Sequence, residues 1–352
     1  MKKKLISLLL ILALLLCGCE VIIPEPIPQP TSATVNTDAD LLTIHYIDVG
    51  QADSILLECG GEYMIIDGGN REDGQLVVTY LQDQGVEELR YVVCTHAHED
   101  HVGGLPSVLA VYPVDNILSP TRTYSSKIFD DFMYYADQQR QEVQIPSAGD
   151  RFTLGTADVT VLGPVDSYAE TNDTSIVLMV TFGDTRFLFT GDMEIAAEND
   201  MMDYWGSDFD WNTDVLKVGH HGSSTSSGYR FLYKADPEYA IVSVGEDNTY
   251  GHPHEEVISR YQDAGIPMFR TDELGHIIVT SDGANISVTW EDQSAQPADV
   301  ESAATSYIGN KNSKKLHLPS CSSLPKEENQ VVFDNYEEAI EAGYTPCSGC
   351  MG

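Results

Sequence analysis

THAHEDHVGG, the stretch from Thr95 to Gly104, holds four side chains that can bind metal ions within six positions. Their spacing is HxHxDH, and they are His96, His98, Asp100 and His101. The stretch follows the apolar run Tyr91-Val92-Val93-Cys94, which is typical of a buried strand. We therefore expect the four side chains in a loop at the end of that strand, where they could hold two metal ions.

The spacing also predicts how these side chains divide between the two ions. Residues two apart in an extended loop point the same way, so His96 and His98 can bind one ion from one side. Asp100 and His101 come where the chain turns into a predicted helix, Leu105 to Val111, and can face a second ion. The alternative is a histidine-rich surface loop without metal, and matching residues downstream argue against it.

Asp192 and His220 are those downstream residues. Asp192 follows the predicted strand Arg186 to Thr190 in the string LFTGD, where a carboxylate can bridge two cations. His220 follows the predicted strand Asp214 to Val218 in LKVGHHGS and can complete the second site. Either residue alone would be an ordinary polar residue at a strand end, but together and in this order they support a metal centre shared with the HxHxDH loop.

Two further polar residues are predicted to support the site. Asp67 ends the apolar strand in YMIIDGG, and we expect it to orient metal ligands rather than to bind metal itself. Lys217 lies three residues before His220 and is placed to help hold a phosphate group.

Taken in order, the motifs around Asp67, the HxHxDH loop, Asp192 and His220 resemble those of the metallo-β-lactamase fold hydrolases. The strings YIDVGQADSILLE, NDTSIVL and LKVGHHGSSTS, followed by YGHPH, are similar to the hydrolase domain of the ComEC/Rec2 competence proteins. The resemblance implies an αββα sandwich over residues 41–292, with metals at one edge between the sheets. It also implies hydrolysis of phosphodiester bonds, often in DNA.

The same resemblance raises two questions about ligands. Other enzymes of this fold carry a third histidine for the first metal, but no histidine lies between His101 and His220 here. Asn172 is a candidate replacement, with Asp173 as the other, and an oxygen ligand favours a harder ion such as manganese over zinc. His252 in YGHPH is a candidate for binding metal or substrate, and a proline-fixed loop before a helix is the alternative.

The first 40 residues predict export. Met1-Lys2-Lys3-Lys4 is basic and Leu5 to Leu16 is apolar, as in a signal segment. Residues 1–19 end in a string that resembles a bacterial lipobox, in which Cys19 would be lipidated. An ordinary signal peptide or an uncleaved anchor is the alternative, and each of them places the chain outside the cytoplasm. Residues 20–40 contain several prolines and predict a linker, so we expect a lipoprotein on the membrane.

The charge of the chain constrains its partners. The 352 residues carry 55 acidic and 19 basic side chains, a formal net charge of −36. Such a chain gains no general attraction to polyanions, because nucleic-acid affinity normally rests on neutralising phosphates with lysine and arginine. Metal ions or a local basic patch would have to hold a phosphate group.

Between the motifs, the hydrophobic pattern predicts two sets of strands flanked by helices. Predicted strands of the first set are Leu42 to Val49, Ser54 to Cys59, Tyr63 to Asp67 and Arg90 to Thr95. Predicted strands of the second set include Phe152 to Leu154, Asp158 to Leu162 and Ser175 to Phe182. Predicted helices include Leu76 to Gln84, a buried face from Ile128 to Ala136, and Glu255 to Ala264. The Gly183-Asp184 pair predicts a hairpin before the strand that leads to Asp192.

The end of the chain predicts a separate zinc module. A polar linker at residues 293–305 precedes residues 306–352, which contain a set spaced for one structural zinc ion: His317, Cys321, Cys347 and Cys350. A disulfide is the alternative in an exported protein. The strings YIGNKNSKKLHLPSC and YEEAIEAGYTPCSGC resemble the zinc-binding module of the Ada DNA-repair methyltransferase. That family has a methyl-accepting cysteine at the position of His317, so the resemblance implies a zinc fold without methyl transfer, with DNA contacts through Lys311, Lys314 and Lys315.

These observations predict an exported metal-dependent phosphodiesterase or nuclease acting on extracellular DNA. Two divalent ions, zinc or manganese, would activate a bridging water. Asp100 would orient it or take its proton, with Asp192 and Lys217 as the other catalytic groups. One alternative is hydrolysis of a small ester, lactone, lactam or phosphorylcholine, which the acidic surface favours. Another is a non-catalytic surface lipoprotein that captures DNA during uptake.

Overall fold

The computed structural model describes residues 41–292, 306–319, 321–333 and 336–351. Cys19, the predicted signal segment and both predicted linkers lie outside these residues. Within the described ranges, no helix combines the length and apolar character that crossing a membrane requires.

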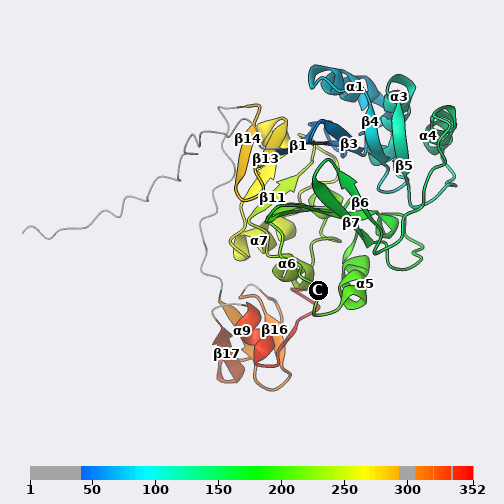
Figure 1. Ribbon diagram of the computed structural model, residues 1–352. Coiled ribbons are helices and arrows are strands. Elements are labelled where there is room, and N and C mark those ends of the chain that lie inside the picture. Colours follow the sequence, from blue (N-terminus) through cyan, green and yellow to red (C-terminus); the bar gives the residue numbers. More distant parts are fainter. Residues whose placement is uncertain (1–40, 293–305, 320, 334–335, 352) are drawn as a thin grey trace, which may run out of the picture. The chain divides into compact units, whose positions relative to one another are not determined.

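Two seven-stranded sheets form the larger part of the fold (Figure 1). The first has the strand order β14-β13-β1-β2-β3-β4-β5. Its strands are β1 (Leu42–Tyr46), β2 (Ile55–Cys59), β3 (Glu62–Ile66), β4 (Leu89–Val93), β5 (Val114–Leu118), β13 (Ile277–Ser281) and β14 (Ile286–Trp290).

The second sheet has the order β12-β11-β10-β9-β8-β7-β6. Its strands are β6 (Arg151–Leu154), β7 (Ala157–Gly163), β8 (Val177–Phe182), β9 (Thr185–Phe189), β10 (Val215–Lys217), β11 (Tyr239–Val242) and β12 (Met268–Arg270). Gly183 adopts a φ of 59° between β8 and β9, a conformation that glycine reaches without a Cβ clash, and the predicted hairpin is present there.

Both sheets change from antiparallel to parallel pairing along their length. In the first, β3, β4 and β5 are parallel neighbours. In the second, β9 to β12 are parallel. Parallel strands end at the same edge of a sheet, so the loops that follow β4, β9, β10 and β11 can gather side chains at one place.

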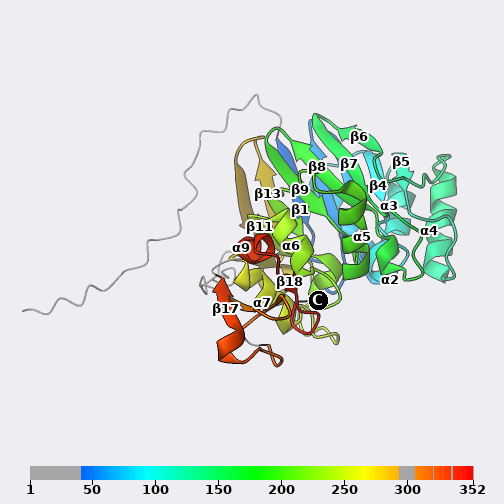
Figure 2. The ribbon, with the colours of Figure 1, turned by 90° about the horizontal axis from the view of Figure 1, so that it is seen from below.

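Helices cover the outer face of each sheet (Figures 1 and 2). On the first sheet lie α1 (Gly74–Asp83), α3 (Leu105–Val111) and α4 (Lys127–Gln138). On the second lie α5 (Ile195–Trp205), α6 (Tyr229–Ala235) and α7 (Glu255–Asp263). The shorter helices are α2 (Glu99–Val102), α8 (Thr271–Leu274), and the 3-10 turns η1 (Arg71–Asp73), η2 (Asn172–Thr174), η3 (Gly219–Gly222) and η4 (Glu327–Asn329).

The spacing of apolar residues explains this layering. Helix α4 buries Ile128, Phe129, Phe132 and Ala136, which repeat at helical intervals, and the Ser126 hydroxyl accepts a hydrogen bond from the Phe129 amide at its start. Burying one such phenylalanine contributes about 1.5–3 kcal/mol. Between the sheets, fully buried residues such as Ile44, Val159 and Phe187 form the central core. The αββα prediction is confirmed.

Two local predictions differ from the structure where the site begins. Strand β3 ends at Ile66, one residue early, because Asp67 turns to a φ of 59° and leaves the strand. The loop after β4 is helical sooner than expected, since α2 starts at Glu99 and carries Asp100 and His101.

The C-terminal module is a four-stranded sheet in the order β17-β15-β16-β18. Its elements are β15 (Tyr307–Asn310), β16 (Lys315–His317), β17 (Gln330–Phe333), β18 (Thr345–Pro346) and α9 (Tyr336–Glu341). Leu316, Phe333 and Tyr344 are buried in its core. A core this small gives a domain little stability without a metal or disulfide.

Candidate metal centre

Four side chains from three loops converge at the edge where β4, β9 and β10 end. They are Asp100, His101, Asp192 and His221, and each offers a ligand atom within 4.8 Å of the others. The Nε2 atoms of His101 and His221 and the Oδ1 atom of Asp192 are buried and have no hydrogen-bond partner in the described structure. Such unpartnered groups are costly in a protein interior. A divalent cation among them would satisfy all three, so the group fits a metal site.

A second pair of ligands lies beside this group. His96 Nε2 and His98 Nδ1 are 3.1 Å apart, and His96 Nε2 lies 4.0 Å from Asp192 Oδ2. The two nitrogen atoms face one space, as the alternation of an extended segment requires. Asp192 lies near both groups, 3.2 Å from His101 Nε2 and 4.0 Å from His96 Nε2, so its carboxylate could contribute ligand atoms to either of them.

Asp67 fixes the orientation of His101 from behind. The Asp67 Oδ2 atom lies 2.8 Å from His101 Nδ1 and accepts a hydrogen bond from the Thr95 hydroxyl (2.6 Å). The Asp67 Oδ1 atom accepts a hydrogen bond from the Thr95 amide (2.7 Å). Carboxylate–imidazole contacts of this kind set the tautomer so that the other ring nitrogen faces the metal.

His220 and His221 are separated by the backbone between them. Both adopt left-handed φ values, 49° and 53°, so their imidazoles leave the chain in different directions. His221 is 1% exposed, and its Nε2 lies 3.4 Å from Asp100 Oδ2. His220 is 23% exposed at the margin, 3.7 Å from Asp192 Oδ2. His220 is the ligand predicted from the sequence, whereas the structure places His221 in the buried group of four.

The candidates that the sequence offered in place of a third histidine lie at this margin among other polar side chains. Asn172 Oδ1 is buried without a hydrogen-bond partner, and its Nδ2 lies 3.4 Å from both ring nitrogens of His220. Glu194 contacts both residues, 3.1 Å from Asn172 Nδ2 and 3.4 Å from His220 Nδ1. Asp173 instead accepts a hydrogen bond from the Glu194 amide, so Asn172 is the better placed of the two candidates.

Lys217 does not reach the substrate side of the site. Its side chain is 0% exposed, and its ammonium lies 2.8 Å from Asp53 Oδ2 and donates to the Val218 carbonyl. Asp53 is as deeply buried, and its Oδ1 lies 3.4 Å from His221 Nδ1. Asp53, Asp67 and His101 also form a group that could hold a cation, but the Lys217 ammonium already supplies the positive charge. The predicted phosphate contact is therefore replaced by a buried ion pair.

The charges of the buried groups agree with cation binding. Burial lowers the pKa of His96 well below its ordinary value, and the neighbouring His101 adds to this effect. Burial opposes protonation of His101, but Asp192 and Asp67 raise its pKa well above the ordinary value. His96 is thus in the neutral form that can bind a metal ion, and the carboxylates around His101 favour positive charge at this place.

His252 lies outside the group of four, on the loop between β11 and α7. Its ring centroid is 5.6 Å from that of His220, and its Nδ1 lies 3.2 Å from Gln51 Nε2. Burial and the nearby His221 lower its pKa to about 4. We call the partly exposed margin of the metal centre around His220 the mouth of the site. His252 is placed to contact a substrate at this mouth rather than to join the buried ligands.

The C-terminal module brings its predicted ligands together. His317, Cys321, Cys347 and Cys350 form one group with ligand atoms within 4.8 Å, and the three cysteines are free thiols. The buried Nε2 atom of His317 has no hydrogen-bond partner among the described residues. One histidine and three cysteines match a tetrahedral structural zinc site.

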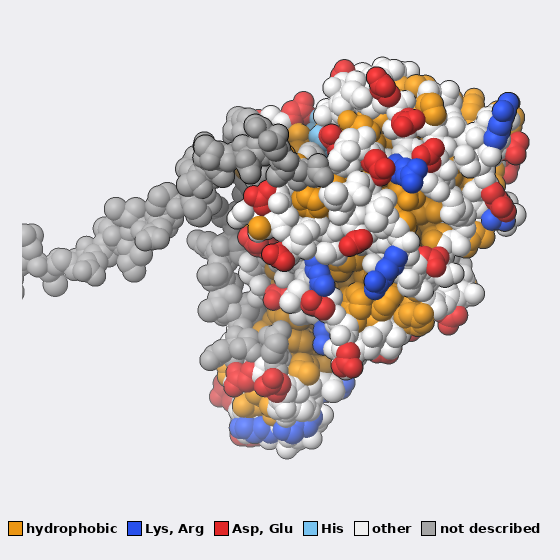
Figure 3. Space-filling model, viewed as in Figure 1, with side chains coloured by type: hydrophobic (Ala, Val, Ile, Leu, Met, Phe, Trp, Pro, Cys, Tyr) orange, Lys and Arg blue, Asp and Glu red, His pale blue; other side chains and the backbone are white. Residues whose placement is uncertain are grey.

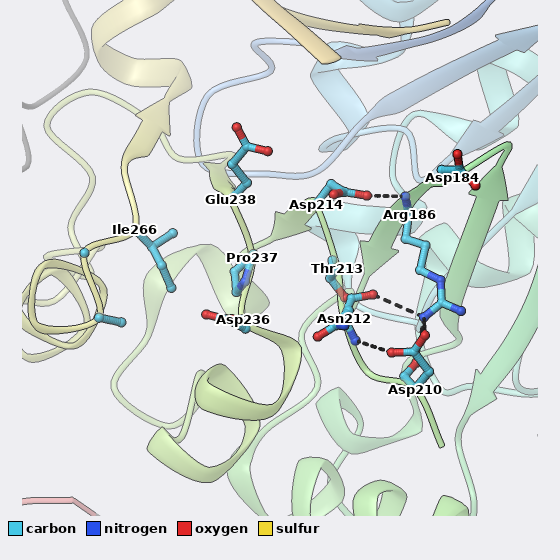
Figure 4. A pocket seen from close by; sticks show the side chains of 12 residues that line it. Asp184, Arg186, Asp210, Asn212, Thr213, Asp214, Asp236, Pro237, Glu238 and Ile266 are labelled. Carbon is cyan, nitrogen blue, oxygen red and sulfur yellow. Dashed lines mark hydrogen bonds and ion pairs between the residues drawn. The ribbon is translucent and has the colours of Figure 1, made fainter. Parts of the chain in front are cut away.

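A cavity of about 620 Å³ lies at the opposite ends of the parallel strands (Figure 4). It is lined by acidic residues around Arg186, whose guanidinium pairs with Asp210 at 2.8 Å and whose amide donates to Asp214. None of the residues that line this cavity belongs to the groups that could hold a metal ion, so the cavity is not the metal centre.

Comparisons with known proteins agree with the two modules. Residues 47–246 match the family described as the metallo-beta-lactamase superfamily, and residues 293–351 match the metal binding domain of Ada. The chain is 29% identical over 253 residues to ComE operon protein 3 of Bacillus subtilis (strain 168), covering 66% of this chain and 32% of that protein. It is 31% identical over 264 residues to competence protein ComA of Neisseria gonorrhoeae, covering 74% of this chain and 34% of that protein.

The chain therefore spans about a third of the length of these curated relatives. Among solved structures, the metallo-beta-lactamase fold protein YhfI from Bacillus subtilis aligns with a TM-score of 0.48 at 13% identity. That alignment covers 69% of this chain and 100% of YhfI.

Proposed function

This chain belongs to the metallo-beta-lactamase superfamily, and on that premise we propose that it is a metal-dependent phosphodiesterase that cleaves DNA outside the cell. The observation that carries the proposal is the convergence of Asp100, His101, Asp192 and His221 beside the His96 and His98 pair. Two divalent ions bound there would lower the pKa of a water molecule and polarise a phosphoryl group.

The side chains at this edge divide the remaining work. Asp100 is 33% exposed, unlike the other three members of its group, so it is the carboxylate that can accept a proton from an attacking water. Asp67 orients His101 as a metal ligand. Asn172 and His220 lie at the partly exposed margin of the site, where their N–H groups can hydrogen-bond to phosphate oxygens.

DNA as the substrate is supported by both modules. The larger domain is similar to a relative named competence protein ComA and to one named recombination protein 2, and the smaller domain matches the metal binding domain of Ada. Basic side chains are visible at the bottom of Figure 3. On the C-terminal module, Lys311, Lys314 and Lys315 are exposed. These lysines stand out on an acidic chain and are the proposed DNA contacts of the module. A lipid anchor at Cys19 would hold the enzyme on the outer face of the membrane.

The test is hydrolysis by purified protein in zinc or manganese. We expect cleavage of bis(4-nitrophenyl) phosphate and of single-stranded DNA, abolished by Asp100→Asn. Glu99→Gln is the matched control, because Glu99 is the exposed neighbour on the same helix and its substitution should leave the rate unchanged. Turnover of nitrocefin, a lactone or phosphorylcholine in place of any phosphodiester would overturn the proposal. DNA binding without turnover would instead support a capture protein.

A further inference from the structure

Tyr250 is an exposed aromatic residue at the mouth of the metal centre. Its side chain is 69% exposed, more than any other large hydrophobic residue in the described parts of the chain. The ring stacks on His252 with centroids 5.6 Å apart and planes 24° from parallel. His252 lies 5.6 Å from the ring of His220, which in turn lies 3.7 Å from Asp192. A line of rings thus leads from the buried carboxylate to the surface.

The loop that carries Tyr250 is held in place by hydrogen bonds. Asn248 donates to the carbonyls of Gly245 and His252 and accepts from the His252 amide, so one side chain joins both ends of the loop. Gln51 accepts from the Gly245 amide and contacts the His252 ring. An exposed ring on a fixed loop loses little conformational entropy when a ligand covers it.

The charge of the chain explains why such a ring would be needed. With 55 acidic and 19 basic residues, the protein has little of the lysine and arginine that usually supply nucleic-acid affinity. Proteins that bind single strands also use aromatic side chains, on which unpaired bases stack with little sequence preference. A base in a duplex is already stacked and paired, so its face is not available to such a ring.

We propose that Tyr250 is the stacking platform for an unpaired base next to the scissile phosphate, and that the substrate is therefore single-stranded DNA rather than duplex. This inference rests on the proposed phosphodiesterase function and adds the strand state of the substrate. His252 supports the inner face of the Tyr250 ring, which leaves the outer face for the base.

The experiment measures binding separately from cleavage. Metal-loaded full-length protein is titrated into three fluorescent phosphorothioate oligonucleotides that resist hydrolysis: a single strand, a hairpin duplex and an abasic strand of equal charge. For the single strand, Tyr250→Ala should weaken binding by about 5- to 150-fold, whereas Tyr250→Phe should retain it. The duplex and the abasic strand should bind weakly to every variant. Tyr204→Ala is the control, because Tyr204 is 58% exposed near the far end of α5 and should have no effect.

The outcomes distinguish this proposal from the function on which it rests. Equal loss of affinity for the single and abasic strands on Tyr250→Ala would overturn the stacking role. So would unchanged affinity for the single strand, or wild-type protein that does not bind it. Absence of hydrolysis with the binding contrast intact would refute the phosphodiesterase and leave Tyr250 as the base contact of a DNA-binding protein.

Discussion

Replacing Lys217 with methionine tests whether its ammonium is a structural counter-ion. The side chain is completely buried, and its Nζ lies 2.8 Å from Asp53, which is itself 2% exposed at the side chain. Methionine retains most of the apolar volume but leaves the Asp53 carboxylate without its cation. Breaking a buried ion pair in this way costs about 3–5 kcal/mol. We therefore expect Lys217→Met to lower the free energy of unfolding by about that amount.

Urea unfolding at one fixed metal concentration measures this difference, because bound metal otherwise shifts the apparent stability. Arg230→Met is the matched control, because it breaks an ion pair at the surface: the side chains of Arg230 and Asp203 are 44% and 70% exposed. This substitution should lower the free energy of unfolding by less than about 1 kcal/mol. The double variant Asp53→Asn/Lys217→Met removes both charges and should be more stable than Lys217→Met alone. If Lys217→Met unfolds within about 1 kcal/mol of the wild type while its KM for a phosphodiester rises, the counter-ion reasoning is wrong and Lys217 contacts substrate.

Four further outcomes are expected. In equilibrium dialysis, His221→Gln should raise the Kd for a metal ion in the larger domain more than about 100-fold, and His220→Gln should raise this Kd less. A larger effect of His220→Gln would contradict the assignment of His221 as the buried ligand. Asp67→Asn should weaken metal binding by about 10- to 100-fold, because His101 loses the carboxylate that orients it; unchanged affinity would argue against that role. Burial, then His276, lowers the pKa of His45 to about 4. Between pH 6.5 and 4 the unfolded chain therefore binds a proton that the folded chain does not, and wild type should lose about 3 kcal/mol of stability that His45→Gln retains; parallel pH profiles would refute this. Finally, His317→Gln should unfold the C-terminal module and leave the larger domain folded, as monitored by limited proteolysis, because one ligand of the zinc group is lost; a module that stays folded would contradict the zinc site and favour a disulfide.

The HxHxDH loop was accessible to sequence reasoning because its geometry is local. His96 and His98 are two residues apart in an extended segment, and their nitrogen atoms meet at 3.1 Å. The strand ends that carry Asp192 and the pair at residues 220 and 221 were also predictable, since parallel strands finish at one edge. Residue spacing therefore indicated which loops meet at the site.

The choice between His220 and His221 was not local in the same sense. Adjacent residues in an ordinary loop offer no periodicity that favours one of them, and here both take left-handed φ values. The direction of each imidazole depends on packing. The His221 ring forms a hydrogen bond with the carbonyl of Ser243, which directly follows the neighbouring strand β11. The string HHGS predicted a ligand, and the packing around it selected which histidine is buried.

Lys217 and Asp53 illustrate the same limit for charge. A lysine three residues before a histidine is compatible with a phosphate contact, and this spacing does not predict that the lysine side chain is buried. Asp53 lies 164 positions before Lys217 in the chain. It is in the GQADS string between β1 and β2 of the first sheet, whereas Lys217 ends β10 of the second sheet. Only the packing of the two sheets brings these charges within 2.8 Å.

The sequence by itself determined the class of fold, the order of the metal-competent loops and the residue types available for chemistry, because hydrophobic period and strand-end position are properties of short segments. The tertiary structure alone decided three features: which of the imidazoles at 220 and 221 is buried, that Lys217 forms a buried ion pair with Asp53, and that Tyr250 lies beside the mouth of the site. These depend on contacts between segments far apart in the chain, and side-chain direction and burial are fixed only when those segments pack together.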